Sequence, residues 1–195
     1  MYKRQTLSTV EAVASQVFIP LTVGGGVSKL QDIERLLEKG ADKVSINTSA
    51  ILDPSLVGNA AKKFGSQCIV VAVDSKREGE KSYVYTHGGK NKTAFETSAW
   101  IKIVEGEGAG EILLTSMDRD GTKIGFDNEL TSSIAKDLSI PLITSGGAGC
   151  IDHMIEGITD GKADAVLAAS IFHQKEITIA EVKDGLASKG IEVRL

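Results

Sequence analysis

Short apolar runs alternate along the chain with segments that show a helical period. The runs are FIPLTV, DKVSIN, CIVVAVD, EILLTS, IPLITS and DAVLAAS. They are apolar throughout rather than alternating with polar residues, which is typical of parallel strands covered on both faces. The alternation of strand and helix, repeated about six times, predicts a parallel sheet with helical crossovers.

Four of the helices have recognisable start signals. Ser28 and Gln31 have the spacing of a capping box, and Gly40 is expected to stop that helix. The other predicted starts carry an N-cap residue, followed in one case by a first-turn proline and in another by a capping glutamate. These starts are Asp53–Pro54, Asp127 and Thr178.

One connection is longer than the others. Residues 76–95 separate a predicted strand from its helix, and they include the alternating stretch SYVYTH. This stretch predicts a small β-hairpin. The hairpin is either a flap over a site or a surface hairpin with no functional role, and the sequence leaves both interpretations open.

Two segments of the chain resemble each other, and each contains adjacent glycines. TVGGGVSKLQDIERLLEKGADKVSINTS aligns with TSGGAGCIDHMIEGITDGKADAVLAASI when the second copy is given one extra residue. In both copies a strand leads through Gly-Gly into a helix, and the next strand ends at a hydroxyl, Thr48 or Ser170. Bare N–H groups at such a turn bind phosphate, although the glycines could serve only to form tight turns. Two copies favour two sites, and therefore a ligand with two phosphates.

Acidic residues follow two of the apolar strands. Asp74 ends an entirely apolar run, so it either caps a helix or is a catalytic group whose pKa is raised by apolar walls. Asp118 and Asp120 lie in the loop SMDRDGT, where a structural turn role is favoured, and Asp120 is also a candidate substrate-site residue. Gly121 would add an amide to the second phosphate site, and Thr115 would face the ligand.

Composition limits the classes of function. The chain has 195 residues and a formal net charge of −4, which argues against a nucleic-acid surface. Its length fits a single domain. The two cysteines and three histidines show no metal-ligand spacing, so no metal site is predicted. Without a leader or an apolar run of about 18 residues, we expect a cytoplasmic protein with reduced thiols and no membrane association.

Several motifs together carry a clear resemblance to a known family. They are TVGGGV, GADKVSINTSA, FGSQCIVVAVDSKR, GAGEILLTSMDRDGTKIGFD, SGGAG and AASIFH. From about residue 6 to its end, the chain resembles the cyclase subunit of imidazole glycerol phosphate synthase. This resemblance implies a (β/α)8 TIM barrel of the ribulose-phosphate-binding type.

The resemblance also implies an activity in histidine biosynthesis. The linear bisphosphate phosphoribulosyl-formimino-aminoimidazole carboxamide ribotide would react with ammonia, giving imidazole glycerol phosphate and aminoimidazole carboxamide ribotide. Ammonia would come from a glutaminase subunit, forming a heterodimer, and would travel through the barrel. No cofactor is implied. The isomerase of the same pathway shares the barrel and the two phosphate sites, and it is the alternative enzyme.

The resemblance implies roles for individual residues. Asp74 would be one of two catalytic aspartates and would act as the general acid. One phosphate site would comprise Gly26, Asn47 and Thr48. The other would comprise Gly121, Gly147, Ala169 and Ser170. The ammonia gate would include Lys43 and Glu111, and the partner-facing positions would be Asp42 and Gln67.

The chain departs from the family pattern at its beginning. The family's first strand, which carries the other catalytic aspartate, has no counterpart, and six of eight β-α units are recognised. We therefore expect residues 1–195 to form one incomplete barrel domain cut from a longer gene, with residues 1–5 not native. A chain with one of two aspartates could instead be a catalytically inactive fragment that binds phosphates or the glutaminase.

Overall fold

The computed structural model describes residues 4–194 of the protein. The prediction that residues 1–5 are not native concerns a segment whose first three residues lie outside this range. The first described element is helix α1 (Arg4–Ala14), which precedes the first strand. Within residues 4–194, no helix is long and apolar enough to cross a membrane.

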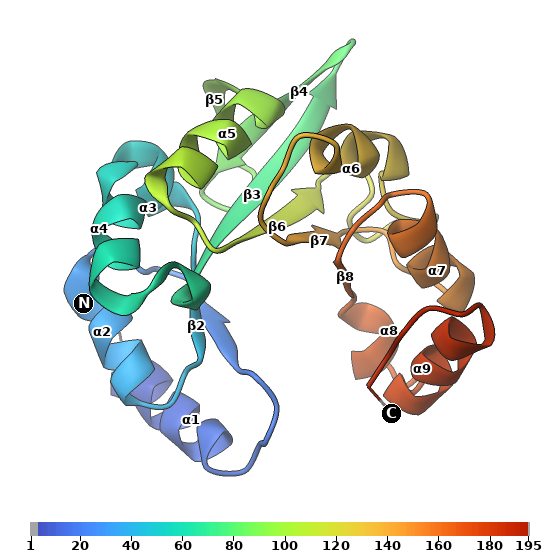
Figure 1. The fold of residues 1–195 in the computed structure, drawn as a ribbon, viewed down its shortest axis with the longest axis horizontal. Coiled ribbons are helices and arrows are strands. Elements are labelled where there is room, and N and C mark those ends of the chain that lie inside the picture. The colour runs from blue at the N-terminus through green and yellow to red at the C-terminus, as the bar shows by residue number, and fades with distance from the viewer. Residues whose placement is uncertain (1–3, 195) are drawn as a thin grey trace.

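Six parallel strands form one curled sheet in the order β1-β2-β3-β6-β7-β8 (Figure 1). The strands are β1 (Thr22–Gly24), β2 (Lys43–Ile46), β3 (Ile69–Glu78), β6 (Glu111–Ser116), β7 (Leu142–Ser145) and β8 (Ala165–Leu167). Each lies within one of the apolar runs or overlaps it, so all six predicted parallel strands are confirmed. The alternating β-α order and the curvature are those of part of a (β/α) barrel, as predicted.

Helices cover the convex outer face of the sheet (Figure 1). The remaining helices are α2 (Leu30–Glu38), α3 (Thr48–Leu52), α4 (Ser55–Phe64), α5 (Thr97–Glu107), α6 (Asn128–Ala135), α7 (Ile151–Thr159), α8 (Ser170–His173) and α9 (Ile179–Ser188), with a 3-10 turn at Ser66–Cys68. Alternate strand residues, such as Val44 and Ile112, are fully buried beneath them. Their sequence neighbours therefore face the concave side.

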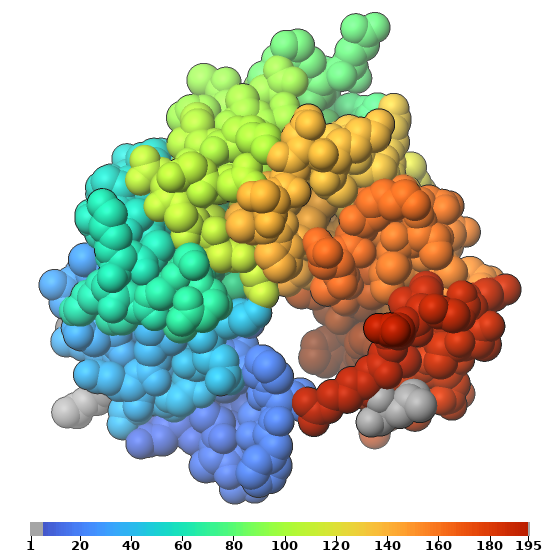
Figure 2. Space-filling view, viewed as in Figure 1, coloured from blue at the N-terminus to red at the C-terminus, as the bar shows by residue number. Residues whose placement is uncertain are grey.

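The apolar core is divided into two clusters. The larger one includes Ile33, Val71 and Trp100, and it lies under the N-terminal and central helices. The smaller one includes Met154 and Ile171 and belongs to the C-terminal elements. Within the described residues, edge strands β1 and β8 do not pair with each other. Figure 2 shows an opening between the N-terminal and C-terminal parts of the surface.

The long connection forms the predicted hairpin. Strand β3 continues past the sheet to Glu78 and pairs antiparallel with β4 (Lys81–Thr86). Strand β4 in turn pairs with β5 (Asn91–Glu96), which leads into α5. The hairpin is thus an extension of the strand that carries Asp74, and it projects from the rim of the sheet (Figure 1).

The predicted helix starts are largely confirmed. The Asp127 carboxylate accepts a hydrogen bond from Leu130 N, and Thr178 forms a full capping box with Glu181. The predicted Ser28–Gln31 box is wrong. Helix α2 begins at Leu30, and the Asp32 carboxylate accepts from both the N–H and the hydroxyl of Ser28, each at 3.1 Å. An ionised carboxylate is a stronger acceptor than an amide, which accounts for the choice of Asp32.

The internal repeat is a structural duplication. In each copy a strand (β1 or β7), a nine-residue helix (α2 or α7), a second strand (β2 or β8) and a short helix (α3 or α8) follow in the same order. Two carboxylates also repeat. Asp42 Oδ2 accepts from Leu21 N at 2.7 Å, and Asp164 Oδ2 accepts from Leu142 N at 2.9 Å. The duplication therefore extends to side chains that tie one strand to the next.

Candidate functional site

The first glycine turn forms one wall of a cavity of about 550 Å³. Gly25 and Gly26 adopt φ of 92° and 78°, a left-handed conformation that glycine tolerates best. No protein atom lies within 4 Å of where a Cβ would stand on either residue, so the turn is open on the cavity side. Thr48, at the end of the next strand, lines the same cavity. We call this arrangement the first cradle.

The hairpin reaches the first cradle. His87 N donates a hydrogen bond to Thr48 Oγ1 at 3.1 Å, and both His87 and Gly88 line the cavity. His87 itself has a positive φ of 55°, which is uncommon for a residue with a side chain. Of the two interpretations of the hairpin, the contact favours the flap.

Asp74 lies in the same cavity, on the concave side of β3. Its Oδ2 accepts a hydrogen bond from Asn47 Nδ2 at 3.0 Å. Burial raises the pKa of Asp74 above its ordinary value, the Asn47 bond opposes that rise, and the charge of Asp120 adds to it. A carboxyl group of this kind holds its proton at higher pH than an exposed aspartate does, which suits a general acid.

The second glycine turn lines a smaller cavity of about 150 Å³. Gly146 and Gly147 have φ of 92° and 103°, close to the values in the first cradle. The other predicted residues that line this cavity are Asp120, Gly121, Ala169 and Ser170. The structure therefore brings together the whole predicted second phosphate site, which we call the second cradle.

A row of polar side chains connects the two cradles across the sheet. Thr115 of β6 is in register with Asp74 on one side and with Ser145 of β7 on the other. Residues in register on neighbouring parallel strands share a face, so all three lie on the concave side. Ser145 also lines the second cradle. The row gives a ligand held at both cradles a polar path past Asp74.

Sequence reasoning missed several residues that line the two cradles, among them His87, Ser145 and Lys123. His87 was part of the hairpin but had no assigned role, and Ser145 preceded the glycines without being selected. Lys123 lines the second cradle and forms an ion pair with Glu176. The signal that was available for Lys123 was its position two residues after Gly121, in a loop already expected at the site.

The predicted gate residues lie at the opposite ends of the strands. Lys43 and Glu111 begin β2 and β6, alternate with buried outward-facing residues, and form an ion pair with each other on the concave side. Asp42 is exposed and accepts from Leu21 N, while Gln67 lies in the Ser66–Cys68 turn. The partner-facing roles of Asp42 and Gln67 remain predictions.

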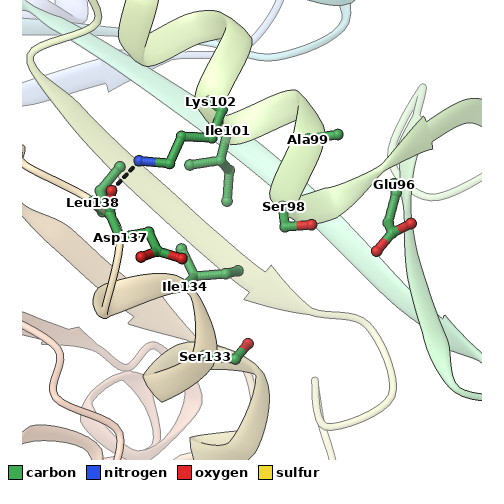
Figure 3. A pocket seen from close by; sticks show the side chains of 9 residues that line it. All are labelled: Glu96, Ser98, Ala99, Ile101, Lys102, Ser133, Ile134, Asp137 and Leu138. Atoms are coloured by element: carbon green, nitrogen blue, oxygen red, sulfur yellow. Dashed lines mark hydrogen bonds between the residues drawn. The ribbon is translucent and has the colours of Figure 1, made fainter.

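A separate pocket lies on the outer face between α5 and α6 (Figure 3). It is lined by Glu96, Ser98, Ala99, Ile101, Lys102, Ser133, Ile134, Asp137 and Leu138. Lys102 donates to the backbone carbonyl of Asp137 across it. No predicted site residue is among its lining residues. Its position behind the sheet separates it from both cradles.

The described residues contain no group of three His, Cys, Asp or Glu side chains placed to hold a metal ion.

Comparison with known protein families identifies a match over most of the chain. A family described as "Histidine biosynthesis protein" matches residues 2–178. This range includes both glycine turns, Asp74 and the hairpin. The family comprises enzymes of histidine biosynthesis built on a (β/α) barrel, in agreement with the curled parallel sheet. The chain belongs to the histidine biosynthesis protein family.

Proposed function

We propose that the chain carries the cyclase activity of imidazole glycerol phosphate synthase. In this reaction a linear bisphosphate and ammonia give imidazole glycerol phosphate and aminoimidazole carboxamide ribotide. Membership of the family supports an enzyme of histidine biosynthesis. The cyclase is the more specific activity that we propose.

One observation carries the proposal: two similar glycine cradles lie along the same rim of the sheet, with Asp74 on the row between them. A backbone turn with open N–H groups and a nearby hydroxyl suits a phosphate group. Two such turns suit a ligand with a phosphate at each end. The reacting centre of that ligand would then pass over Asp74.

Asp74 supplies the proton that the reaction needs. Condensation of ammonia with a ketone releases water, and the leaving oxygen must be protonated as its bond to carbon breaks. A half-buried carboxyl group with a raised pKa holds a proton for this step and becomes an ionised carboxylate once it has given the proton away. Thr115 and Ser145 can hydrogen-bond the polar chain of the ligand alongside.

The cyclase proposal draws support from the resemblance at Lys43 and Glu111, which form an ion pair with each other. A charged pair inside the sheet curvature is costly to bury and serves no phosphate site. The resemblance assigns both residues to an ammonia gate, which an isomerase does not need. In this proposal a glutaminase subunit binds the face where these strands begin and delivers ammonia past the pair.

The test is an assay with the linear bisphosphate, with ammonium chloride in place of the glutaminase. We expect aminoimidazole carboxamide ribotide to form only when ammonium is present. A parallel assay offers the cyclic precursor used by the isomerase. Asp74→Asn is the matched control, because it keeps the shape of the side chain and removes its acidity.

Each result separates the alternatives. Ammonium-dependent product that disappears in Asp74→Asn supports the cyclase. Turnover of the isomerase substrate without ammonium uptake would replace it with the isomerase. Binding of the bisphosphate with no turnover of either substrate would identify the chain as an inactive phosphate-binding protein.

A further inference from the structure

Asn47 is bound to Asp74 and not to the turn in which it lies. Its Nδ2 donates to Asp74 Oδ2 at 3.0 Å. Its Oδ1 is buried and has no hydrogen-bond partner among the described residues. An unpaired buried acceptor is uncommon and calls for an explanation. The amide is therefore oriented so that its nitrogen bonds the Asp74 carboxylate, while its own oxygen is left without a donor in the described part of the chain.

The position of Asn47 makes this choice more informative. Asn47 precedes helix α3 as its N-cap residue, where asparagine normally accepts a hydrogen bond from a backbone N–H of the first turn. No such bond from the Asn47 side chain is found in the structure. The side chain is therefore turned away from the helix that it precedes and toward the strand that carries Asp74.

The duplicated half of the molecule provides a comparison. Ala169 precedes α8 just as Asn47 precedes α3, and the two residues share a φ of −122°, with ψ of −67° and −95°. Alanine has no polar side chain, so the backbone turn forms without an amide. What the first copy has in addition is the carboxylate of Asp74 within hydrogen-bond distance.

We propose that Asn47 is a positioning residue that orients the Asp74 carboxylate and stabilises its ionised form. This inference rests on the proposed acid role of Asp74. Burial favours the protonated acid before the reaction, and the Asn47 amide favours the carboxylate that remains once the proton is transferred. The two effects together keep the proton available without holding it too tightly. In this role Asn47 acts through Asp74 and not as a phosphate ligand.

Other groups near Asp74 must be considered in any pH experiment. The charge of Asp120, from the loop after β6, raises the pKa of Asp74. His87, from the hairpin, lines the same cavity, and Tyr85 of β4 is in register with Asp74. Asn47 is the neighbour whose hydrogen bond lowers the pKa. Its removal is therefore expected to move the titration of Asp74 in one direction only.

The experiment is a pH titration of the Asp74 side chain by NMR in protein with ¹³C-labelled aspartate, with the signal assigned by its loss in Asp74→Asn. We compare the original protein with Asn47→Leu, which keeps the size of the side chain and removes its donor. The midpoint should rise by about one pH unit or more, the effect expected for loss of a hydrogen bond to a charged group. If Asn47→Leu does not fold, Asn47→Ser provides the second variant.

Thr48→Val is the matched control. Thr48 lies in the same cradle as Asn47, but it has no side-chain amide to donate to Asp74. Its midpoint should stay within about 0.3 units of the original, a small fraction of the shift expected for a charged hydrogen bond. In the ammonium-dependent assay, the loss of kcat at high pH should move upward in Asn47→Leu by the same amount as the NMR midpoint. The titration needs no turnover, so failure of the cyclase assignment would leave this test intact.

The proposal is overturned if Asn47→Leu leaves the midpoint unchanged or lowers it. It is also overturned if the variant titrates normally but binds the bisphosphate at least tenfold more weakly. That second result would make Asn47 a phosphate ligand, the role that the resemblance implies.

Discussion

The two cradles have nearly the same backbone and very different surroundings. Each has two left-handed glycines, a following helix of nine residues and a hydroxyl at the end of the next strand. The first cradle is joined to Asp74 through Asn47 and is touched by the hairpin. The second has Ala169 in place of the amide, with Asp120 and Lys123 beside it.

This difference separates binding from chemistry. Features that recur in both copies, the glycines and the hydroxyl, are those that an anion requires. Features that occur in one copy, the amide and the half-buried acid beside it, are those that the proposed proton transfer would use. In the proposed function, phosphate binding falls to both cradles and acid chemistry to the first alone, and each of the following changes tests one side of this division.

The largest expected effect is on turnover in Asp74→Asn. Loss of a positioned general acid typically lowers kcat by about 10²–10⁴-fold. Asp120→Asn removes the acidic residue of the second cradle. Its fold-decrease in kcat should be at least ten times smaller than that of Asp74→Asn. The measurement is kcat for ammonium-dependent product formation. Equal losses in the two variants would mean that acid chemistry is shared between the cradles.

The next effect is on stability and distinguishes the two glycine turns. A Cβ on Gly147 would stand 2.2 Å from the carbonyl oxygen of Gly125, whereas one on Gly26 would meet no atom within 4 Å. We expect Gly147→Ala to lower the free energy of unfolding by more than about 3 kcal/mol. Gly26→Ala should cost about 1–2 kcal/mol, from its positive φ alone.

Denaturant unfolding followed by circular dichroism gives both values for the glycine variants. The contrast arises because the second turn is packed against the loop after β6, with Gly125 N bonded to Gly147 O at 2.8 Å. A Gly26→Ala variant as unstable as Gly147→Ala would show that the first turn is packed in the same way.

A smaller effect concerns the hydroxyls of the two cradles. Thr48→Val and Ser170→Ala should each raise KM for the bisphosphate about tenfold, the loss expected for one hydrogen bond to a charged group. If the cradles hold opposite ends of one ligand, the double variant should show roughly the product of the two losses. Thr48→Ser and Ser170→Thr keep the hydroxyls and should stay within about twofold of the original.

A double variant no worse than either single variant would contradict two-ended binding, because it would mean that both hydroxyls serve one phosphate.

The smallest effect compares the repeated carboxylates. Asp42→Ala and Asp164→Ala each remove an acceptor from a backbone N–H, at Leu21 and Leu142 respectively. We expect losses of about 1–2 kcal/mol in the free energy of unfolding, with Asp164 the larger because its bond is partly buried. Unfolding curves measured in parallel test this order. A larger loss at Asp42 would reverse it.

Much of the fold could be predicted because its strands are short apolar runs, although only the face beneath the helices is fully buried. The six apolar runs, the Gly40 stop and the Asp127 and Thr178 caps depend on local sequence, and each has its predicted place in the structure. The Ser28 cap was misassigned because two acceptors, Gln31 and Asp32, compete within one turn. The choice between them depends on acceptor strength and exact helix start, which spacing alone does not determine.

The site was predictable where residues repeat and unpredictable where distant segments meet. Gly147, Ser170 and Thr48 were found because each belongs to a copy of the same pattern. The contact of His87 with Thr48 joins residues 39 positions apart through a hairpin turn. The local sequence around either residue does not predict this contact. The pairing of Asn47 with Asp74 likewise depends on how β2 and β3 align.

The most direct test of two cradles serving one ligand is a crystal structure of the protein with the linear bisphosphate, prepared without ammonia. The account predicts one phosphate against Gly25, Gly26 and Thr48, and the other against Gly146, Gly147 and Ser170. The chain between them should cross Asp74. Both phosphates in a single cradle, or the ligand in the outer pocket between α5 and α6, would contradict the account.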